Sequence, residues 1–534
     1  DEFASWAYWT KELYLTDSLS GPDMLWRQLA YPQGWPVALI FPQLPFDEFK
    51  PQRSLSIGLI WYAATIGLVY EFVALHLRDM VRIDRRISGV IGYIIVFAMI
   101  SVEAIYKFVP QNLLIEQPQV LLITAIFLLF FHISIGNETT RTGALGVGLL
   151  LSAGVMLKSP VIASLPAIVV VLVWLSFRHS WNRPLMSRAG CALIDITILV
   201  TPVLLVMWIW MEYINGLNSG LGRIGFSFEF GPSHVAIVER IISAAGSYLL
   251  GWKIPLTLLS IIGFFLAFGE RGLRPIAFGI ILYFATYFVG LVELYAFRFS
   301  PYEVAELQSH QRYLRVPLRV LHLIGSVTLC LMILRYLLSA PNYLKNNNQK
   351  VMWNKLFGFA CAALGCATIL FIDRDMAENA NRNAMDSRRT QVIADLRADN
   401  ARLLEILVDQ KSLGLQTPPS LKLIAQGDDG YSLRVVRFLS LRNKKGKNRR
   451  NYQIFDGYSW GPESENIWMN KITKKNLRSE LSNADIIWSH RSNDWMDSVI
   501  FPLLINCTDQ IGWVFLIKDQ DSESGFRCYS REHR

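Results

Sequence analysis

Ten apolar stretches occupy most of residues 1–373 of this 534-residue chain, and they constrain the fold more than any other feature. Several reach the roughly 20 residues that an α-helix needs to cross a bilayer. The stretches cover residues 55–77, 87–108, 118–136, 143–157, 160–177, 190–213, 254–268, 272–293, 315–338 and 354–373. The sequence therefore predicts an α-helical polytopic membrane protein with about ten transmembrane helices.

The composition agrees with a chain whose main solvent is lipid. Hydrophobic residues make up 52% of the sequence and charged residues only 18%, whereas a typical soluble domain carries about 25% charged residues. These values exclude a disordered protein, a small disulfide scaffold and an ordinary cytosolic enzyme.

The positive charges predict the orientation. Lysine and arginine concentrate in four loops that fall on one side if every stretch crosses, namely 78–86, 178–189, 269–274 and 339–353. Lysine and arginine are retained in the cytoplasm, so that side is cytoplasmic. The segments expected outside are 1–54, 109–117, 214–253, 294–314 and 374–534. Much of the net charge of +9 is thus a topology signal, and no nucleic-acid partner is expected.

Residues 374–534 have a polar character and predict one exported soluble α/β domain, beside a membrane domain over 1–373. Residues 384–411 have the pattern of a long amphipathic helix. The β-rich runs that follow it are Leu433–Leu439, Tyr452–Phe455, Ala484–Ser489 and Gly512–Lys518. The basic stretch 442–450 suits anionic headgroups or lipopolysaccharide. Tryptophans that serve either a hydrophobic core or sugar stacking are Trp460, Trp468, Trp488 and Trp495.

Two of the six cysteines, Cys507 and Cys528, lie in the expected exported domain. An oxidising compartment would allow a disulfide between them. The alternative is a pair of free buried thiols. No spacing typical of a Cys/His metal site occurs.

Acidic residues stand at two expected outer membrane boundaries. Asp1 and Glu2 precede an apolar face at helical spacing, formed by Phe3, Trp6, Trp9, Leu13 and Tyr14. That face predicts a helix lying in the membrane interface. Glu116 stands at the start of the next outward-facing helix, where it serves either as a functional acid or as a charge stabilising the helix N-terminus. Other acids in or near the apolar stretches are Glu71, Glu103, Asp195 and Glu293.

Cations face the same side. Lys158 lies between two apolar stretches, where it either snorkels to the boundary or binds an anion. The loop 294–314 and the start of the next helix add Arg298, His310, Arg312, Tyr313 and Arg315. A guanidinium suits bidentate contact with phosphate. The alternative is pairing with Glu303 and Glu306 or with lipid headgroups.

Acids and cations on one face suit a reaction on an amphiphile with a phosphate head and a lipid tail. A carboxylate can take the proton of an acceptor hydroxyl. A divalent cation, Mg²⁺ or Mn²⁺, held by Asp1 and Glu116 can neutralise a phosphate leaving group. Lys158 and Arg312 can do so electrostatically.

The order of these motifs resembles the GT-C glycosyltransferases that use polyprenyl-phosphate sugars, a family that includes protein O-mannosyltransferases and the aminoarabinose transferases of lipid A. The resemblance covers roughly residues 1–373. The motifs that carry it are Asp1-Glu2, Tyr31-Pro-Gln-Gly-Trp-Pro36, Ile115-Glu116-Gln117-Pro118, Leu157-Lys158-Ser159-Pro160 and His310-Gln311-Arg312-Tyr313. Family members have a membrane helix before the acidic motif, so such a helix is expected ahead of Asp1. Glu116 replaces an aspartate that is commoner in the family.

The resemblance implies transfer of a sugar from a polyprenyl-phosphate donor to a lipid, glycan or protein acceptor, with inversion. By family, Asp1 or Glu2 acts as the base, Glu116 assists, and Lys158, His310, Arg312 and Tyr313 hold the donor phosphate. The implied location is a bacterial inner membrane, with the active site and C-terminal domain on the periplasmic side. No cofactor besides the divalent cation is implied. Two other hypotheses remain open from the residues alone: a lipid or solute transporter or flippase, and a non-catalytic scaffold of the same fold.

Overall fold

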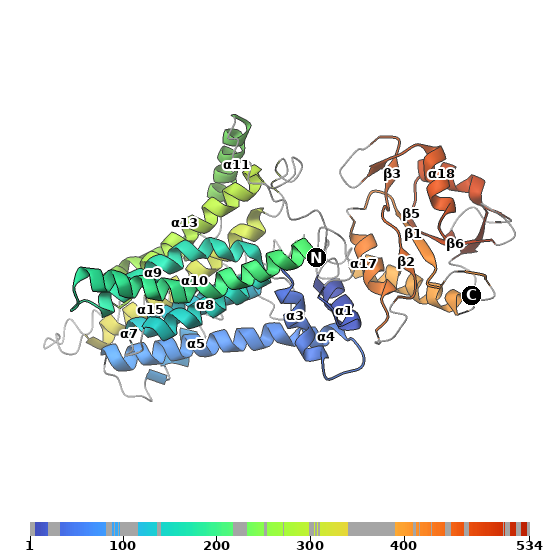
Figure 1. Ribbon diagram of the computed structural model, residues 1–534. Coiled ribbons are helices and arrows are strands. Elements are labelled where there is room, and N and C mark those ends of the chain that lie inside the picture. Colours follow the sequence, from blue (N-terminus) through green and yellow to red (C-terminus); the bar gives the residue numbers. More distant parts are fainter. Residues whose placement is uncertain are drawn as a thin grey trace. The chain divides into compact units, whose positions relative to one another are not determined.

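A computed structural model describes much of the chain as two compact units (Figure 1). One unit comprises residues 22–38 and 55–376, and the other comprises 1–21, 39–54 and 377–534. The structure describes residues 6–19, 32–81, 88–89, 91–93, 95–96, 116–135, 140–216, 232–249, 254–270, 272–297, 304, 307, 310–339, 390–408, 413–415, 417–428, 430–443, 450–463, 469–505, 507, 513–519 and 525–530.

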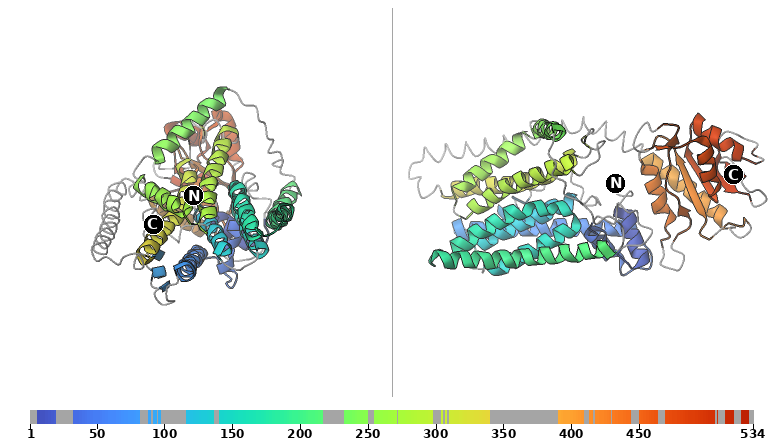
Figure 2. Two further views of the ribbon diagram at one scale, coloured as in Figure 1. Left: turned by 90° about the vertical axis from the view of Figure 1, so that its left-hand side faces the viewer. Right: turned by 45° about the horizontal axis from the view of Figure 1, so that its top comes forward.

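The first unit, which we call the helical unit, is built from long apolar helices. They are α5 (Ser56–Val81), α7 (Glu116–Ile135), α8 (Thr140–Leu157), α9 (Leu165–His179), α10 (Leu185–Gly216), α11 (Pro232–Leu249), α12 (Ile254–Phe268), α13 (Arg274–Phe297) and α15 (His310–Ser339), with the 3-10 helix η3 (Ser159–Ser164) between α8 and α9. Figure 2 shows α8, α9 and α10 running alongside one another.

Seven helices among the described residues are long and apolar enough to cross a membrane. Their spans are Pro51–Arg78, Glu116–Ser134, Thr140–Leu157, Pro160–His179, Leu185–Asn215, Arg274–Phe297 and His310–Ile333, and Leu256–Phe268 is a shorter apolar helix. Eight of the ten predicted stretches thus coincide with helices. The predicted stretch 354–373 and most of 87–108 lie outside the described residues. The helical membrane class is confirmed, and the count of ten stays a prediction.

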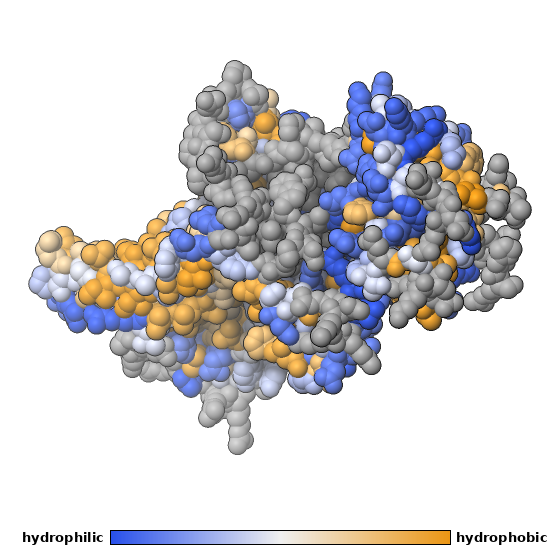
Figure 3. All heavy atoms as spheres, turned by 45° about the vertical axis from the view of Figure 1, so that its right-hand side comes forward, coloured by the Kyte–Doolittle hydropathy of each residue, from blue (hydrophilic) through white to orange (hydrophobic). Residues whose placement is uncertain are grey.

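Burial separates the central helices from the peripheral ones. In α7, 83% of the membrane-length window is buried, and in α15 the share is 78%, whereas α5 and α10 bury only 22% each. The outer helices expose large apolar side chains, as Leu204, Trp208 and Ile209 of α10 do. Figure 3 shows apolar side chains gathered over the helical unit. A soluble protein rarely exposes such a surface, so it is expected to face lipid.

Small residues allow close helix contact where α12 meets α15. A Cβ added to Gly263 would lie 2.4 Å from the backbone oxygen of Gly325. A Cβ on Gly325 would likewise lie 2.6 Å from the Cβ of Ser260. Such small residues are typical of membrane helix interfaces, where van der Waals packing replaces the hydrophobic drive.

Contacts between helix ends indicate that successive helices of the helical unit run in alternating directions. Arg178, near the end of α9, donates to Ser134 Oγ near the end of α7 at 3.1 Å. Ser134 in turn donates to the backbone oxygen of Gly272, just before α13, at 2.9 Å. The ends of α7 and α9 and the start of α13 therefore meet at one end, which leaves the start of α7 at the other. An ion pair between Arg312 and Glu116 places the start of α15 beside the start of α7.

The second unit, which we call the α/β unit, contains a five-stranded sheet of order β2-β1-β5-β6-β7. The strands are β1 (Ser420–Ala425), β2 (Gln453–Ile454), β5 (Ile486–Arg491), β6 (Trp513–Lys518) and β7 (Phe526–Ser530), and β3 (Trp460–Gly461) pairs separately with β4 (Asn470–Lys471). β1 runs parallel to β2 and β5, whereas β6 is antiparallel to both β5 and β7.

Helices cover both faces of this sheet (Figure 1). On one face Leu421, Leu423 and Ala425 of β1 pack against the helix over 390–407 and against α17 (Tyr431–Ser440). On the other face Ile424 contacts α18 (Lys474–Ser482) and α19 (Asp494–Ile500). Alternation along a strand places successive side chains on opposite faces, so a three-layer α/β sandwich results.

Sequence predictions for this unit were partly wrong. The run Leu433–Leu439, expected to be β-rich, lies within the helix α17. Leu433, Val436 and Ser440 repeat at three and four residues and are buried, which is the spacing of one helical face. The runs around β2, β5 and β6 do form strands, and the amphipathic helix is present over 390–407.

Two N-terminal segments belong to the α/β unit although the sequence assigned them to the membrane domain. The first contains α1 (Ala7–Thr16), and the second contains η2 (Phe41–Gln43) and α4 (Pro51–Ser54). The hydroxyl of Tyr14 donates to the backbone oxygen of Phe46 at 2.5 Å, which joins the two segments.

Candidate functional site

Glu116 opens α7 and is almost buried, with 7% of its surface exposed. A carboxylate in the first helical turn interacts favourably with the partial positive charge there. Pro118 follows within that turn, where its missing N–H leaves no helical hydrogen bond unmade. The sequence around residue 116 thus places a carboxylate in the first turn of a buried helix.

Lys158 reaches Glu116 from the end of α8. Its backbone is extended (φ −160°, ψ 126°) and separates α8 from η3. Its Nζ donates to Glu116 Oε1 at 3.0 Å, and the Lys158 side chain is 7% exposed. A lysine charge this deeply buried needs such a partner, because desolvation alone would disfavour it.

Arg312 and Tyr313 complete the arrangement from the first turn of α15. Arg312 Nε lies 3.2 Å from the same Glu116 Oε1. The Tyr313 ring has Lys158 Nζ at 4.7 Å and the Arg312 guanidinium carbon at 5.4 Å from its centroid. Both distances suit cation–π attraction. We call these four residues the Glu116 cluster.

The Glu116 cluster carries more positive than negative charge. One carboxylate oxygen faces two cations, so the four side chains sum to +1. Arg312 is the accessible member, with 34% of its side chain exposed. An excess positive charge beside a partly buried aromatic ring favours an anionic ligand, and a guanidinium suits phosphate.

Polar atoms with unused hydrogen-bonding capacity border the cluster. Glu116 Oε2 is buried and has no hydrogen-bond partner among the described residues. The side-chain nitrogen of Gln119, one turn further along α7, is in the same state. Buried polar atoms are almost always satisfied, so these two atoms are available to a polar group beside α7.

The other sequence candidates have separate positions. His310 begins α15, and its Nδ1 lies 2.9 Å from the backbone oxygen of Leu307. Arg315 donates from Nε to the hydroxyl of Tyr248 at 3.1 Å, toward α11. Asp1, Glu2 and Arg298 lie outside the described residues.

The described surroundings of Glu116 do not fit a divalent cation. Lys158 and Arg312 already occupy Oε1, and both would repel Mg²⁺ or Mn²⁺. No group of three or more His, Cys, Asp or Glu side chains with metal-binding geometry occurs among the described residues. The proposed partner ligand Asp1 lies outside them, so the cation stays a prediction.

Residues 32–36 of the proline-rich motif pack beside the C-terminal end of α8, which leads into Lys158. The backbone of this motif comes so close that a Cβ on Gly34 would lie 2.6 Å from the backbone oxygen of Met156. Only glycine allows this approach. Gly34 begins α3 (Gly34–Ile40), and Met156 lies two residues before Lys158. The motif therefore lies near the Glu116 cluster.

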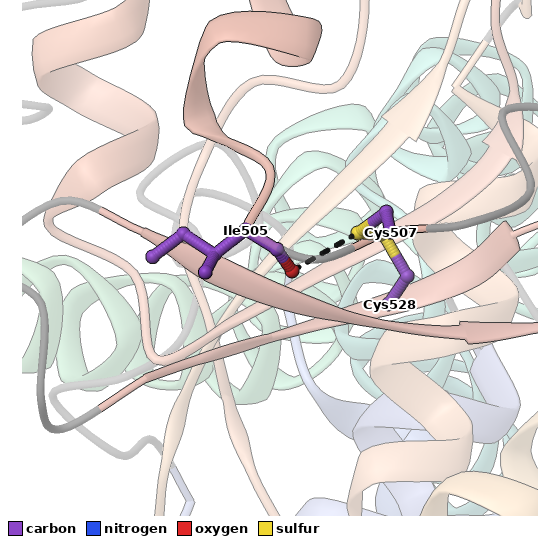
Figure 4. The surroundings of a disulfide bond; sticks show 3 residues. All are labelled: Ile505, Cys507 and Cys528. Atoms are coloured by element: carbon purple, nitrogen blue, oxygen red, sulfur yellow. Dashed lines mark hydrogen bonds between the residues drawn. A yellow bond between two sulfur atoms is a disulfide. The ribbon is translucent and has the colours of Figure 1, made fainter.

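The cysteine pair of the α/β unit is joined. Cys507 and Cys528 form a disulfide with a Cα–Cα distance of 5.7 Å (Figure 4). The bond ties β7 to the segment after η5 (Phe501–Leu503).

The candidate sugar-stacking tryptophans divide by burial. Trp460 and Trp488 are core residues, with 2% and 0% exposed. Trp495 is only partly buried, and it borders a shallow hollow of about 470 Å³ beside the start of α18. Trp468 lies outside the described residues.

Sequence reasoning missed the surroundings of Lys11 and Glu12. Both residues lie off the apolar face that predicts an interfacial helix here, but α1 is buried throughout, from Ala7 to Leu15. Their partners lie more than 400 residues away in sequence. Helical periodicity reports only on local faces, so no signal for this contact was available.

Comparison with known proteins adds no relative: no protein-family model, curated protein or solved structure matches the chain.

Proposed function

We propose that this chain is an integral-membrane glycosyltransferase that moves a sugar from a polyprenyl-phosphate donor to an acceptor hydroxyl at the outer face of the membrane. The observation that carries the proposal is the convergence of Glu116, Lys158, Arg312 and Tyr313 at one end of the helical unit. The starts of α7 and α15 and the junction between α8 and η3 contribute these side chains, and together they provide a net positive, partly accessible site. The location at helix ends suits a phosphate held at headgroup depth.

In the proposed reaction an acceptor oxygen attacks the anomeric carbon of the donor sugar. The bond from that carbon to the phosphate oxygen breaks, and the configuration inverts. Lys158 and Arg312 stabilise the negative charge that develops on the leaving phosphate. The acceptor proton passes to the carboxylate of Asp1 or Glu2. Glu116 assists by orienting both cations.

A specific observation favours a transporter or flippase as the second candidate. Asp195 of α10 is 1% exposed and accepts a hydrogen bond from Ser176 of α9 at 2.5 Å. Acids buried within membrane helices often belong to ion or proton paths. The Glu116 cluster would then hold a lipid phosphate without chemistry.

Transfer from a panel of radiolabelled polyprenyl-phosphate sugars into membrane-bound acceptor tests the proposal. The variants Asp1→Asn, Glu2→Gln and Lys158→Met are compared with the parent in membranes. Arg178→Gln is the matched control, because Arg178 is a cation at the opposite end of the unit.

The proposal expects labelled product from at least one donor with the parent and with the control. Lys158→Met and at least one of the two acid variants are expected to lose about 100-fold or more in rate. Full activity in Lys158→Met would overturn the role of the cluster. Absence of transfer from every donor, with uptake or flipping of the same lipids in vesicles, would favour the second candidate.

A further inference from the structure

A hollow of about 470 Å³ on the α/β unit is lined by an aromatic ring and two lysines. Trp495 of α19 is half-buried, whereas Lys471 and Lys474 are exposed. The remaining lining residues are Pro462, Ile472, Thr473 and Asn476. No acid is among the lining residues, so the hollow combines an apolar ring with a net positive charge. Sites for small molecules have this size and this mixture of aromatic and charged groups.

The lysines stand where helix electrostatics disfavours a cation. α18 begins with Lys474 and Lys475, and its first turn contains no acidic residue. A helix N-terminus carries partial positive charge and stabilises acids, not lysines. None of the ion pairs in the described part of the α/β unit involves Lys471, Lys474 or Lys475. Local stability does not account for these residues, and such a departure is expected at a functional site.

The hollow lies at the edge of the sheet where the parallel strands β1 and β5 end. The backbone N–H of Gln426, directly after β1, donates to the backbone oxygen of Arg491, the last residue of β5, at 3.1 Å. Gln426 Nε2 donates to the backbone oxygen of Trp460 at 2.9 Å, which brings β3 to the same edge. Pro462 follows β3, and Trp495 lies in the first turn of α19, just after β5. Residues on both sides of the hollow therefore belong to this edge.

The direction of the chain through the sheet reverses at the same edge. β1 lies between β2 and β5. The chain reaches β2 through α17 on one face of the sheet, and it reaches β5 through α18 on the other face. Open α/β sheets bind ligands outside the carboxyl ends of the strands where the connections diverge in this way. The place of the hollow in the fold thus supports a binding role independently of its lining.

We propose that this hollow binds a saccharide that carries an acidic group, either a uronate carboxylate or a phosphate. The sugar ring stacks on Trp495, because the C–H face of a pyranose is apolar and weakly positive and the face of an indole is negative. The acidic group accepts charge-assisted hydrogen bonds from the ammonium groups of Lys471 and Lys474. The site belongs to the α/β unit alone and goes beyond the proposed function, so it holds whether or not the chain transfers sugar.

The test is a titration of the full chain in phosphatidylcholine nanodiscs, followed by saturation-transfer difference NMR. The probes are digalacturonate, glucose 6-phosphate, the neutral sugar maltose and adenosine monophosphate. Hydrogen–deuterium exchange of the amides of residues 471–477 locates the bound sugar. The variants are Lys471→Met, Lys474→Met and Trp495→Leu. Lys475→Met is the matched control, because Lys475 is an exposed lysine of the same helical turn that does not line the hollow.

At least one acidic sugar is expected to bind about 10-fold more tightly than maltose and to slow exchange of the 471–477 amides. The tighter of the two acidic sugars identifies the acidic group as carboxylate or phosphate. Each of Lys471→Met and Lys474→Met should weaken this binding about 3- to 10-fold. Trp495→Leu should weaken it about 10-fold, whereas Lys475→Met should stay within about 2-fold of the parent.

Four results would overturn the proposal. Equal losses in Lys474→Met and Lys475→Met would show attraction to diffuse surface charge. Equal affinity for maltose and the acidic sugars would exclude recognition of an acidic group. Tighter binding of adenosine monophosphate than of either acidic sugar would indicate a nucleotide site. Unchanged affinity in Trp495→Leu would exclude stacking on this ring. The lysine variants change exposed side chains, so they keep the test decisive if Trp495→Leu fails to fold.

Discussion

Replacement of Glu116 by glutamine should affect ligand affinity and catalysis in opposite directions. The carboxylate neutralises one of the two cations that face it, with Lys158 Nζ at 3.0 Å and Arg312 Nε at 3.2 Å from the same oxygen. Glu116→Gln keeps the size of the side chain and raises the charge of the cluster from +1 to +2. A bound phosphate should therefore be attracted more strongly.

The magnitude follows from the geometry. A phosphate that contacts both cations would lie roughly 6 Å from the Glu116 carboxylate, about two hydrogen-bond lengths. Repulsion between two unit charges at that distance is about 3 kcal/mol at an effective dielectric constant of ~20. Solvent around the 34%-exposed Arg312 screens part of this. We expect a gain of about 1–2 kcal/mol, which is roughly 5- to 30-fold in affinity.

The assay is equilibrium binding of radiolabelled polyprenyl phosphate to the full chain in nanodiscs, at two salt concentrations. Glu116→Asp, which keeps the charge, should bind within about 3-fold of the parent. The transfer rate of Glu116→Gln should fall at the same time, because both cations lose the group that orients them. Weaker or unchanged lipid-phosphate binding in Glu116→Gln would refute the electrostatic reasoning, whatever happens to transfer.

Three further predictions concern single groups. Burial lowers the pKa of Lys11 from 10.5 to about 7. Between these pH values the unfolded chain binds a proton that the folded unit does not, so the free energy of unfolding relative to Lys11→Met should rise with pH above 7 by up to about 1.4 kcal/mol per pH unit. Thermal unfolding from pH 6 to 9 measures this, and a constant difference would contradict it. Serine at Cys507 and Cys528 should destabilise the α/β unit by about 3 kcal/mol, because the bond closes a loop of 21 residues in sequence separation; denaturant unfolding with an unchanged midpoint would contradict this. Tyr313→Leu should weaken lipid-phosphate binding about 2- to 10-fold through loss of the cation–π contact with Lys158. Tyr313→Phe keeps the ring and should bind within about 2-fold of the parent. An equal loss of affinity in both variants would exclude that contact as the cause.

The membrane part of the fold was predictable because its signal is local. The apolar stretch 118–136 is long enough by itself to fix α7, whatever its neighbours do. The α/β unit was harder. The run Leu433–Leu439 contains adjacent β-branched and aromatic residues that favour a strand, yet its packing against the β1 face selects a helix. Local propensity is a weak guide where tertiary burial decides.

In the candidate site, too, the sequence identifies single residues but not the tertiary contacts between them. Glu116, Lys158 and Arg312 were each ambiguous in sequence, because a helix-capping acid, a snorkelling lysine and a headgroup-binding arginine explain them equally well. Only contact between the ends of α7, α8 and α15 joins them into one cluster. The docking of Lys11 on α17 had no sequence signal at all, since its acceptors are backbone oxygens that any residue carries.

The geometry around Glu116 also indicates which variants can distinguish a transferase from a flippase. Two cations face the Glu116 carboxylate and stabilise its charged form, which makes it a weak base toward an acceptor hydroxyl. If the chain transfers sugar, we therefore expect the base to be another acid, and Asp1 and Glu2 are the acids that the family resemblance assigns. A flippase needs the cations but no base. Loss of transfer in Asp1→Asn and Glu2→Gln with intact lipid-phosphate binding would thus be specific to transfer chemistry, whereas loss of binding in Lys158→Met is expected under both functions.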